Sequence, residues 1–256
     1  MEAKLYLHHG GLSTIWNTRR KLNHSHKPEC LLTVQAVLTS PPRDATIRKL
    51  DSTTTVYNDN WYNRIAINHL SQSFQTTTGV KNVKVGYDSL VDAAKVVYQK
   101  FSTTKQQELV VQTLENAFPK PILSLVRILM PPSTFTREYF AIFTTIFFAW
   151  LVGPSEVKES EIEGKIEKNV VHVKKCRFME GTNCVGMCIN LCKMPSQKFI
   201  KNSFGMSVNM VPNFDDMSCD MIFGQDPPAQ SDDPALKQPC FSMCKVKQKH
   251  NSECVN

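Results

Sequence analysis

Cysteine is the residue type with the greatest capacity for chemistry in this sequence, and its distribution is uneven. Nine cysteines occur among 256 residues; one is Cys30, and the other eight lie between Cys176 and Cys254. Cys184, Cys188 and Cys192 follow one another at intervals of four residues. Cysteines at such short intervals are typical of zinc and iron–sulfur sites. The sequence therefore predicts a metal site in the last third of the chain.

The cysteines that could bind this metal outnumber the ligands of a single ion. The candidates are Cys184, Cys188, Cys192, Cys219, Cys240, Cys244 and Cys176. An unbroken helix would separate Cys184 from Cys192 by about 12 Å, which bonds of about 2.3 Å to one ion do not span. Either this segment bends near Gly186, or only two of its three cysteines share a site. No Cys-x-x-Cys motif occurs, so the spacing does not identify the metal.

Two explanations other than a metal stay open for the cysteine density. Disulfides require an oxidising compartment, which the N-terminal sequence argues against. Buried thiols also pack as small, inert hydrophobic side chains on a core helix. His172 is the nearest candidate ligand that is not a cysteine, but we expect it to face solvent from a strand.

Residues 1–50 are predicted to be a plastid transit peptide and flexible leader. They hold eight Lys or Arg against three Asp or Glu, with scattered Ser and Thr and no long apolar segment. This composition is typical of an organelle transit peptide rather than a secretory signal. Val34-Gln35-Ala36 resembles a plastid processing site, so cleavage is expected near Ala36. The alternative is a disordered tail without a targeting role.

Residues 51–155 are predicted to be a helical bundle, because apolar residues recur there at helical spacing. The most apolar segment is Tyr139–Val152, which as a helix would be about 21 Å long and too short for a bilayer core of about 30 Å. We expect a buried core helix. Its aromatic residues offer an alternative, a slot for a large apolar ligand. The candidate substrate-binding residues are Phe143, Phe147 and Trp150.

The remaining sequence divides into a charged hinge, residues 156–168, and a cysteine-rich domain, residues 169–256. Alternation predicts strands near 169–178 and 206–211, and Pro195 is expected to open a helix. The predicted fold class is α+β, with a mainly helical N-terminal bundle followed by a small cysteine-rich α+β metal-binding module.

The charge distribution and the remaining residues exclude several functional classes. Outside the leader, 22 Lys or Arg are balanced by 20 Asp or Glu, so no basic face for nucleic acid is indicated. No Ser/His/Asp or paired-carboxylate arrangement is evident, and we name no catalytic acid, base or nucleophile.

Several long segments are recognisable: DNWYNRIAINHLS, REYFAIFTTIFFAWLVGPSEV, PCFSMC, and CRFMEGTNCVGMCINLCKMPSQKFIKNSFGMSVNMVPNFDDMSCDMIFGQDPP. They resemble the plant plastid beta-carotene isomerases of strigolactone biosynthesis. The resemblance covers roughly Tyr57 to Cys254 and is strongest over Cys176–Cys244.

The resemblance implies an iron-containing cis–trans isomerase. Such an enzyme would convert all-trans-beta-carotene reversibly into 9-cis-beta-carotene, the first committed step towards carlactone and strigolactones. It implies that cysteines hold the iron, with Cys184, Cys188 and Cys192 first and the other four candidates competing for the remaining positions. Whether the iron is mononuclear or an iron–sulfur cluster stays open.

The resemblance also implies a location and partners. The protein is expected in the chloroplast stroma, in peripheral contact with a plastid membrane or lipid droplet, because its substrate dissolves in lipid. A downstream carotenoid cleavage dioxygenase is expected to consume the product. Two other functions stay open, a plastid iron–sulfur electron-transfer protein and a carotenoid-binding protein with structural zinc.

Overall fold

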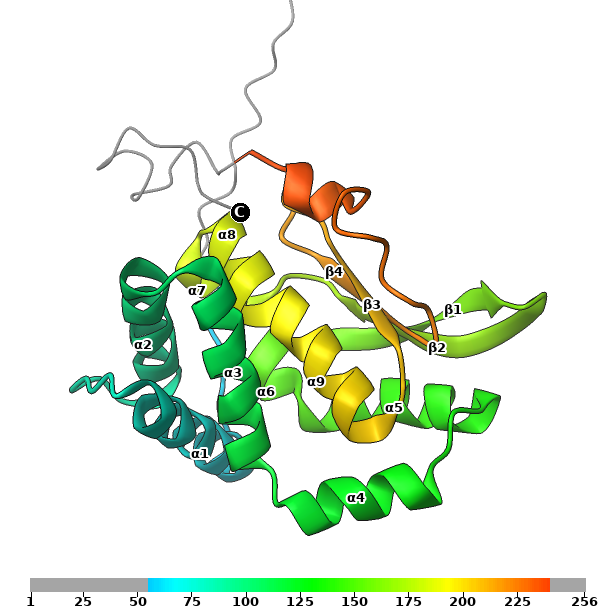
Figure 1. Ribbon diagram of the computed structural model, residues 1–256, viewed down its shortest axis with the longest axis horizontal. Helices are drawn as coiled ribbons and strands as arrows, with labels where there is room; N and C mark the ends of the chain where they lie inside the picture. Colours follow the sequence, from blue (N-terminus) through cyan, green and yellow to red (C-terminus); the bar gives the residue numbers. More distant parts are fainter. Residues whose placement is uncertain (1–54, 240–256) are drawn as a thin grey trace, which may run out of the picture. The chain divides into compact units, whose positions relative to one another are not determined.

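A computed structural model describes residues 55–239 of the chain. These residues form two layers, in which helices pack against one face of a four-stranded antiparallel sheet (Figure 1). The predicted α+β class is therefore confirmed. The predicted leader 1–50 and the candidate ligands Cys240 and Cys244 lie outside the described residues.

The helical layer begins with α1, whose N-terminal cap was predictable from the sequence. The helices before the first strand are α1 (Trp61–Thr78), α2 (Gly86–Lys100), α3 (Thr103–Ala117), α4 (Lys120–Leu129), α5 (Thr134–Phe147) and α6 (Ala149–Val152). The Asn60 side chain accepts a hydrogen bond from the backbone N–H of Asn63 at 2.9 Å, as expected of an N-cap. Helix α1 packs on α2 and α3, α4 packs on α9, and α5 packs on β2.

The apolar segment 139–152 is not one fully buried helix. Helix α5 ends at Phe147, and the short helix α6 follows after Phe148. One side of α5 is buried through Phe140 and Ala141, whereas Ile142 and Ile146 on the other side are exposed. The prediction of a core helix is therefore correct for one face only. Within residues 55–239, no helix is both long and apolar enough to cross a membrane.

The sheet has the strand order β1-β2-β4-β3, and all its pairs are antiparallel. Its strands are β1 (Ser155–Ile162), β2 (Lys165–Val173), β3 (Val208–Pro212) and β4 (Cys219–Phe223). The stretch 156–168 is thus a β-hairpin rather than the predicted hinge. Glu163 and Gly164 turn the chain with positive φ angles of 51° and 77°. Most of the charged side chains that suggested a hinge lie exposed or partly exposed on β1 and the first residues of β2, whereas Glu167 is buried.

The cysteine-bearing segment between β2 and β3 is helical throughout most of its length. Its elements are α7 (Arg177–Thr182), α8 (Val185–Cys188), the π-helix η1 (Ile189–Lys193) and α9 (Met194–Phe204). A short 3₁₀ helix, η2 (Pro234–Lys237), follows the sheet. Helix α9 contains the Pro195 that was expected to open a helix.

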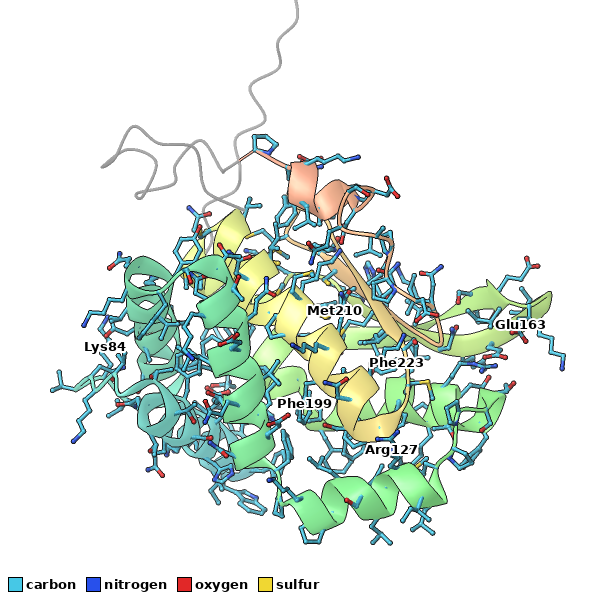
Figure 2. All side chains as sticks on the ribbon, viewed as in Figure 1. Lys84, Arg127, Glu163, Phe199, Met210 and Phe223 are labelled. Carbon is cyan, nitrogen blue, oxygen red and sulfur yellow. The ribbon has the colours of Figure 1, made fainter. Side chains whose placement is uncertain are left out.

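One hydrophobic core joins the helices to the cysteine-rich segment. Phe199, Met210 and Phe223, from α9, β3 and β4, are all buried in it (Figure 2). The ring of Phe140 on α5 stacks on that of Phe223 at 5.9 Å between centroids. The predicted helical bundle and cysteine-rich module therefore pack as one unit within the described chain, and no hinge separates them.

A cysteine-lined cavity as the candidate metal centre

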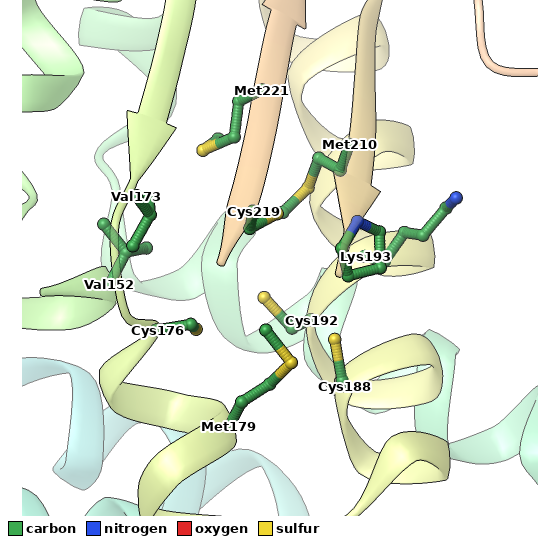
Figure 3. Close-up of a pocket in the computed structure, with 11 residues that line it drawn as sticks. Val152, Val173, Cys176, Met179, Cys188, Cys192, Lys193, Met210, Cys219 and Met221 are labelled. Carbon is green, nitrogen blue, oxygen red and sulfur yellow. The ribbon is translucent and has the colours of Figure 1, made fainter. Parts of the chain in front are cut away.

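Four of the predicted ligands, Cys176, Cys188, Cys192 and Cys219, line a single cavity of about 20 Å³ (Figure 3). They come from three separate segments: the residue before α7, the α8–η1 helix and the start of β4. Cys184 is buried but does not line this cavity. The structure thus gathers four of the seven candidates and separates Cys184 from them.

Strand register builds one wall of the cavity. Val173 pairs with Cys219, and Cys219 pairs in turn with Pro212. The next inward-facing row contributes Met210 and Met221, which are also paired. Because side chains alternate across a strand, these two rows face the helices together. The sheet therefore contributes one thiol to the cavity, that of Cys219, and apolar side chains surround this thiol.

A change of helix type builds the opposite wall. Helix α8 ends at Cys188, and the chain continues as a π-helix through Lys193. Cys184 precedes this helix with an extended backbone, so the 184–192 segment is not an unbroken helix. Of the two alternatives, the structure supports two cysteines, Cys188 and Cys192, at one cavity. Single turns of π-helix occur frequently at functional sites.

The backbone at Gly186 lies directly against an aromatic side chain of α2. A Cβ at Gly186 would stand 2.2 Å from the hydroxyl oxygen of Tyr98, far closer than real Cβ contacts. Glycine is therefore required for α8 to lie at this depth, and this placement brings Cys188 to the cavity.

An arginine fixes the start of α7, immediately after Cys176. The Arg177 guanidinium donates two hydrogen bonds of 2.7 Å to Asp59 and one of 2.9 Å to the Trp150 carbonyl. It also lies between the rings of Tyr57 and Tyr87, 4.5 and 4.0 Å from their centroids. Paired and stacked charges of this kind hold a planar group rigidly. The segment before α1 thereby holds one edge of the cavity in place.

A buried ion pair adjoins the cavity. The Nζ atom of Lys193 lies 2.5 Å from Asp233 Oδ2, and only 2% and 4% of the two side chains are exposed. Asp233 also accepts a hydrogen bond from the backbone N–H of Ala235, which caps η2. The ion pair thus connects the end of the π-helix η1 to the N-terminus of η2.

Burial holds all four thiols in the protonated form. It raises the pKa of Cys176, raises that of Cys192 to about 12, and raises those of Cys188 and Cys219 well above the usual value. At Cys188, Cys192 and Cys219, the negative charge that neighbouring cysteines would carry as thiolates adds to the rise in pKa. The Lys193 ammonium lowers the pKa values of Cys188 and Cys219. A bound cation would favour the thiolates, because metal binding releases thiol protons.

The donor chemistry of the cavity fits a thiolate-bound metal such as iron. Four thiols surround a space of about 20 Å³, and a volume of roughly 10–15 Å³ holds one water-sized sphere. Within residues 55–239, however, no three His, Cys, Asp or Glu side chains lie close enough to hold an ion in their present positions. Metal binding would therefore have to draw the sulfur atoms inward.

His172 does not line the cavity. It lies on the opposite face of β2 from Val171 and Val173, and its Nδ1 atom is 2.6 Å from Asp220 Oδ1 on the neighbouring strand. The side chain is partly exposed, in agreement with the expected orientation. His172 therefore forms a cross-strand pair with Asp220, apart from the cysteines.

The three aromatic candidates lie on a row of contacting rings that runs from the partly exposed Phe147 to the buried Trp150. Phe147 is partly exposed and contacts Phe143 at 4.6 Å between centroids. Phe143 contacts Phe148 at 6.0 Å, and Phe148 contacts the buried Trp150 at 6.2 Å. Val152, two residues after Trp150, lines the cavity. We call Phe147, Phe143, Phe148 and Trp150 the aromatic row.

Sequence reasoning missed the partners of the cysteines. Met179, Met210 and Met221 line the cavity with them, and Lys193 stands beside it with Asp233. The alternation of VNMVP and CDMIF is a signal that could have placed Met210 and Met221 on the inner face of strands. No local signal pairs Lys193 with Asp233, because forty residues separate them.

Comparison with known proteins identifies the class to which this fold and cavity belong. A family model described as "Beta-carotene isomerase D27-like, C-terminal" matches residues 150–232, the part of the chain that holds the four cysteines. No solved structure matches the chain.

Two curated relatives extend the match beyond that segment. The chain is 59% identical over 256 residues to a Medicago truncatula protein named "Beta-carotene isomerase D27, chloroplastic", and the match covers both chains completely. It is also 52% identical over 194 residues to an Arabidopsis thaliana protein of the same name. This second match covers 75% of this chain and 74% of the relative. The chain belongs to the D27 family of plastid beta-carotene isomerases, which confirms both the resemblance and the predicted plastid location.

Proposed function

We propose that this enzyme interconverts all-trans- and 9-cis-beta-carotene with iron held by Cys176, Cys188, Cys192 and Cys219, early in strigolactone (carlactone) biosynthesis. The observation that carries the proposal is the convergence of four thiols from three segments on one cavity. The names of the relatives support the isomerase activity and the carotene substrate.

The reaction requires a temporary loss of double-bond character at one position of the polyene. Reactant and product are isomers, so no atom is gained or lost and no net oxidation occurs. Iron, when bound, supplies reversible one-electron exchange with the polyene. The isomerisation requires no general acid or base.

The residues around the thiols keep water away and balance charge. Val152, Met179 and Met221 give the cavity apolar walls. The Lys193 ammonium, held by Asp233, places a positive charge beside groups that become thiolates on metal binding. An apolar lining of this kind limits the water that can reach the thiols.

The substrate lies outside the cavity. A C40 hydrocarbon is many times larger than a space with room for roughly one water molecule. The aromatic row is the surface on which the polyene would lie, since its rings lead inward from Phe147 to Trp150 beside the Val152 wall. Its rings would orient the 9,10 bond toward the cysteines.

The proposal is tested by anaerobic purification with metal analysis and chromatography of beta-carotene isomers before and after chelation. We expect iron in the purified protein and a 9-cis product that disappears when iron is removed and returns when iron is restored. Iron-free protein that isomerises at the full rate would reject the role of iron. Zinc in place of iron, with unchanged isomer ratios, would make the cysteine site structural.

The location of the substrate adds a requirement for lipid contact. Beta-carotene dissolves in lipid and not in water, so the enzyme would collect it from a plastid membrane or lipid droplet. The product would pass to a carotenoid cleavage dioxygenase by the same route.

A further inference from the structure

Helix α4 exposes a row of large apolar side chains. Ile122, Leu125, Ile128 and Leu129 are 55–76% exposed, and their spacing of three to four residues places them on one side of the helix. Only Leu123 on the opposite side is buried. We call these four exposed residues the α4 face. Clustered apolar exposure of this kind marks an interaction surface.

Helix α5, which follows α4, also exposes large apolar side chains. After the break at Pro131-Pro132 the chain returns along α5 (Figure 1). Phe135, Ile142 and Ile146 are exposed on α5 at spacings of seven and four residues, again on one side of a helix. Two consecutive helices thus present apolar side chains, and α5 also bears Phe147, the outer end of the aromatic row.

The charges around the α4 face have one sign. Residues 119–136 contain Lys120 and Arg127 but no Asp or Glu. The Arg127 guanidinium donates a hydrogen bond to the Asn202 carbonyl at 3.1 Å, which holds it on the α9 side of the helix. By helical spacing both basic residues lie on the side of α4 away from the apolar face, as they do in amphipathic helices that lie in the headgroup region of anionic bilayers.

We propose that the α4 face docks on an anionic lipid bilayer, with the exposed side of α5 next to it. The proposal rests on the proposed function, because a hydrocarbon substrate is available only from lipid. Docking there would bring Phe147 to the lipid surface and give carotene a continuous aromatic path toward the cysteine cavity. Lipid, rather than a protein partner, accounts for both the apolar face and the exclusively basic charge around it.

Vesicle flotation of the full chain tests the docking surface directly. Vesicles of phosphatidylcholine alone are compared with vesicles that also contain phosphatidylglycerol. The double variant Leu125→Ser/Ile128→Ser is expected to lower the bound fraction about tenfold. The control Val83→Ser/Ile166→Ser removes two exposed apolar side chains elsewhere, and it should float like the unsubstituted chain. All variants keep the basic residues 1–50, so any attraction of that segment for the vesicles is common to them.

The charge requirement is tested by a second pair of variants. Lys120→Glu is expected to weaken binding to the phosphatidylglycerol vesicles about fivefold and to leave binding to the neutral vesicles almost unchanged. The control Lys81→Glu reverses an exposed charge between α1 and α2 and should have no effect. Equal losses in the two variants would overturn the role of α4 charge.

An activity measurement separates docking from catalysis. Leu125→Ser/Ile128→Ser should isomerise carotene in detergent micelles at the rate of the unsubstituted chain, but carotene in vesicles about tenfold more slowly. Full vesicle binding by this variant would overturn the proposal. So would a dimer, detected by light scattering, that the variant converts to monomer, because a second copy would then cover the face. Failure of the unsubstituted chain to isomerise carotene in micelles would instead reject the proposed function and leave the binding result intact.

Discussion

The cysteine cavity and the α4 face differ in almost every physical property. The cavity has a volume of about 20 Å³ and is lined mostly by buried side chains from α6, α7, α8, η1 and the sheet. The α4 face is exposed to solvent, and Leu123 is the one buried side chain of helix α4. The cavity is thus suited to hold a small group rigidly, whereas the α4 face is suited to a large and deformable partner.

In the proposed function, chemistry and substrate supply occupy separate parts of the molecule. A cavity of this size excludes a C40 polyene, and the α4 face has no group that could change a double bond. In the proposed function the aromatic row, which runs from Phe147 on α5 to Trp150, connects the two. Substitutions in the cavity region should therefore alter stability and metal binding, and substitutions on the α4 face should alter neither.

The largest effect is expected at the buried ion pair beside the cavity. Lys193→Met should lower the free energy of unfolding by about 3–5 kcal/mol, because Asp233 would remain buried without its partner. Urea denaturation measures this change. The exposed Lys81→Met should change stability by less than about 0.5 kcal/mol. Adding Asp233→Asn to Lys193→Met should recover part of the lost free energy of unfolding. A loss below about 1 kcal/mol in Lys193→Met alone would show that the ion pair does not hold the cavity.

A smaller effect, dependent on pH, is expected at the hydrogen-bonded carboxylate of Glu180 on α7. Burial raises the pKa of Glu180, but hydrogen bonds from Lys175, Thr55 and Tyr57 outweigh it and lower the pKa from 4.5 to about 2. A lowered pKa in the folded state means that this contribution to stability is complete above pH 4.5 and is lost as the pH falls toward 2.

The pH dependence is measured against a variant that cannot titrate at this position. Unfolding midpoints of the native chain should fall between pH 4.5 and pH 2 more steeply than those of Glu180→Gln. Parallel curves for the two proteins would show that the carboxylate gains nothing from its partners in the folded state.

The smallest effect is expected in the aromatic row. Phe143→Leu and Phe147→Leu should each raise KM for carotene in detergent about threefold to tenfold, because a ring that contacts the polyene is lost. Iron content should stay the same in both. Trp61→Leu removes an exposed ring outside the row and should leave KM unchanged. A fall in iron content with KM intact would place these rings in the support of the metal site.

The helices were predictable from sequence, whereas two of the strands were not. Apolar spacing in α1 to α4 follows the helical period, because each helix buries one side. Strand β1 was predicted to be a hinge because four of its eight residues are charged, and none of the eight is buried. Strand β4 is five residues long, too short for alternation alone to establish it.

The residue type that forms the site was predictable from the sequence, but which of the cysteines line the cavity was not. The density of cysteines identified the region. The choice of Cys176 and Cys219 depends on a strand register, in which Val173 lies opposite Cys219. The separation of Cys184 from Cys188 and Cys192 depends on an extended residue before α8 and a π-helix after it. Neither the strand register nor the local backbone conformation can be predicted from the spacing of the cysteines.

The most direct test of this account compares iron content and isomerase activity among single cysteine variants. Cys188→Ser and Cys219→Ser remove thiols that line the cavity, and Cys184→Ser removes a buried thiol that does not. The account predicts that the first two lose nearly all bound iron and activity, and that Cys184→Ser retains both. Loss of iron in Cys184→Ser equal to that in the other two, or full iron in Cys188→Ser, would contradict it.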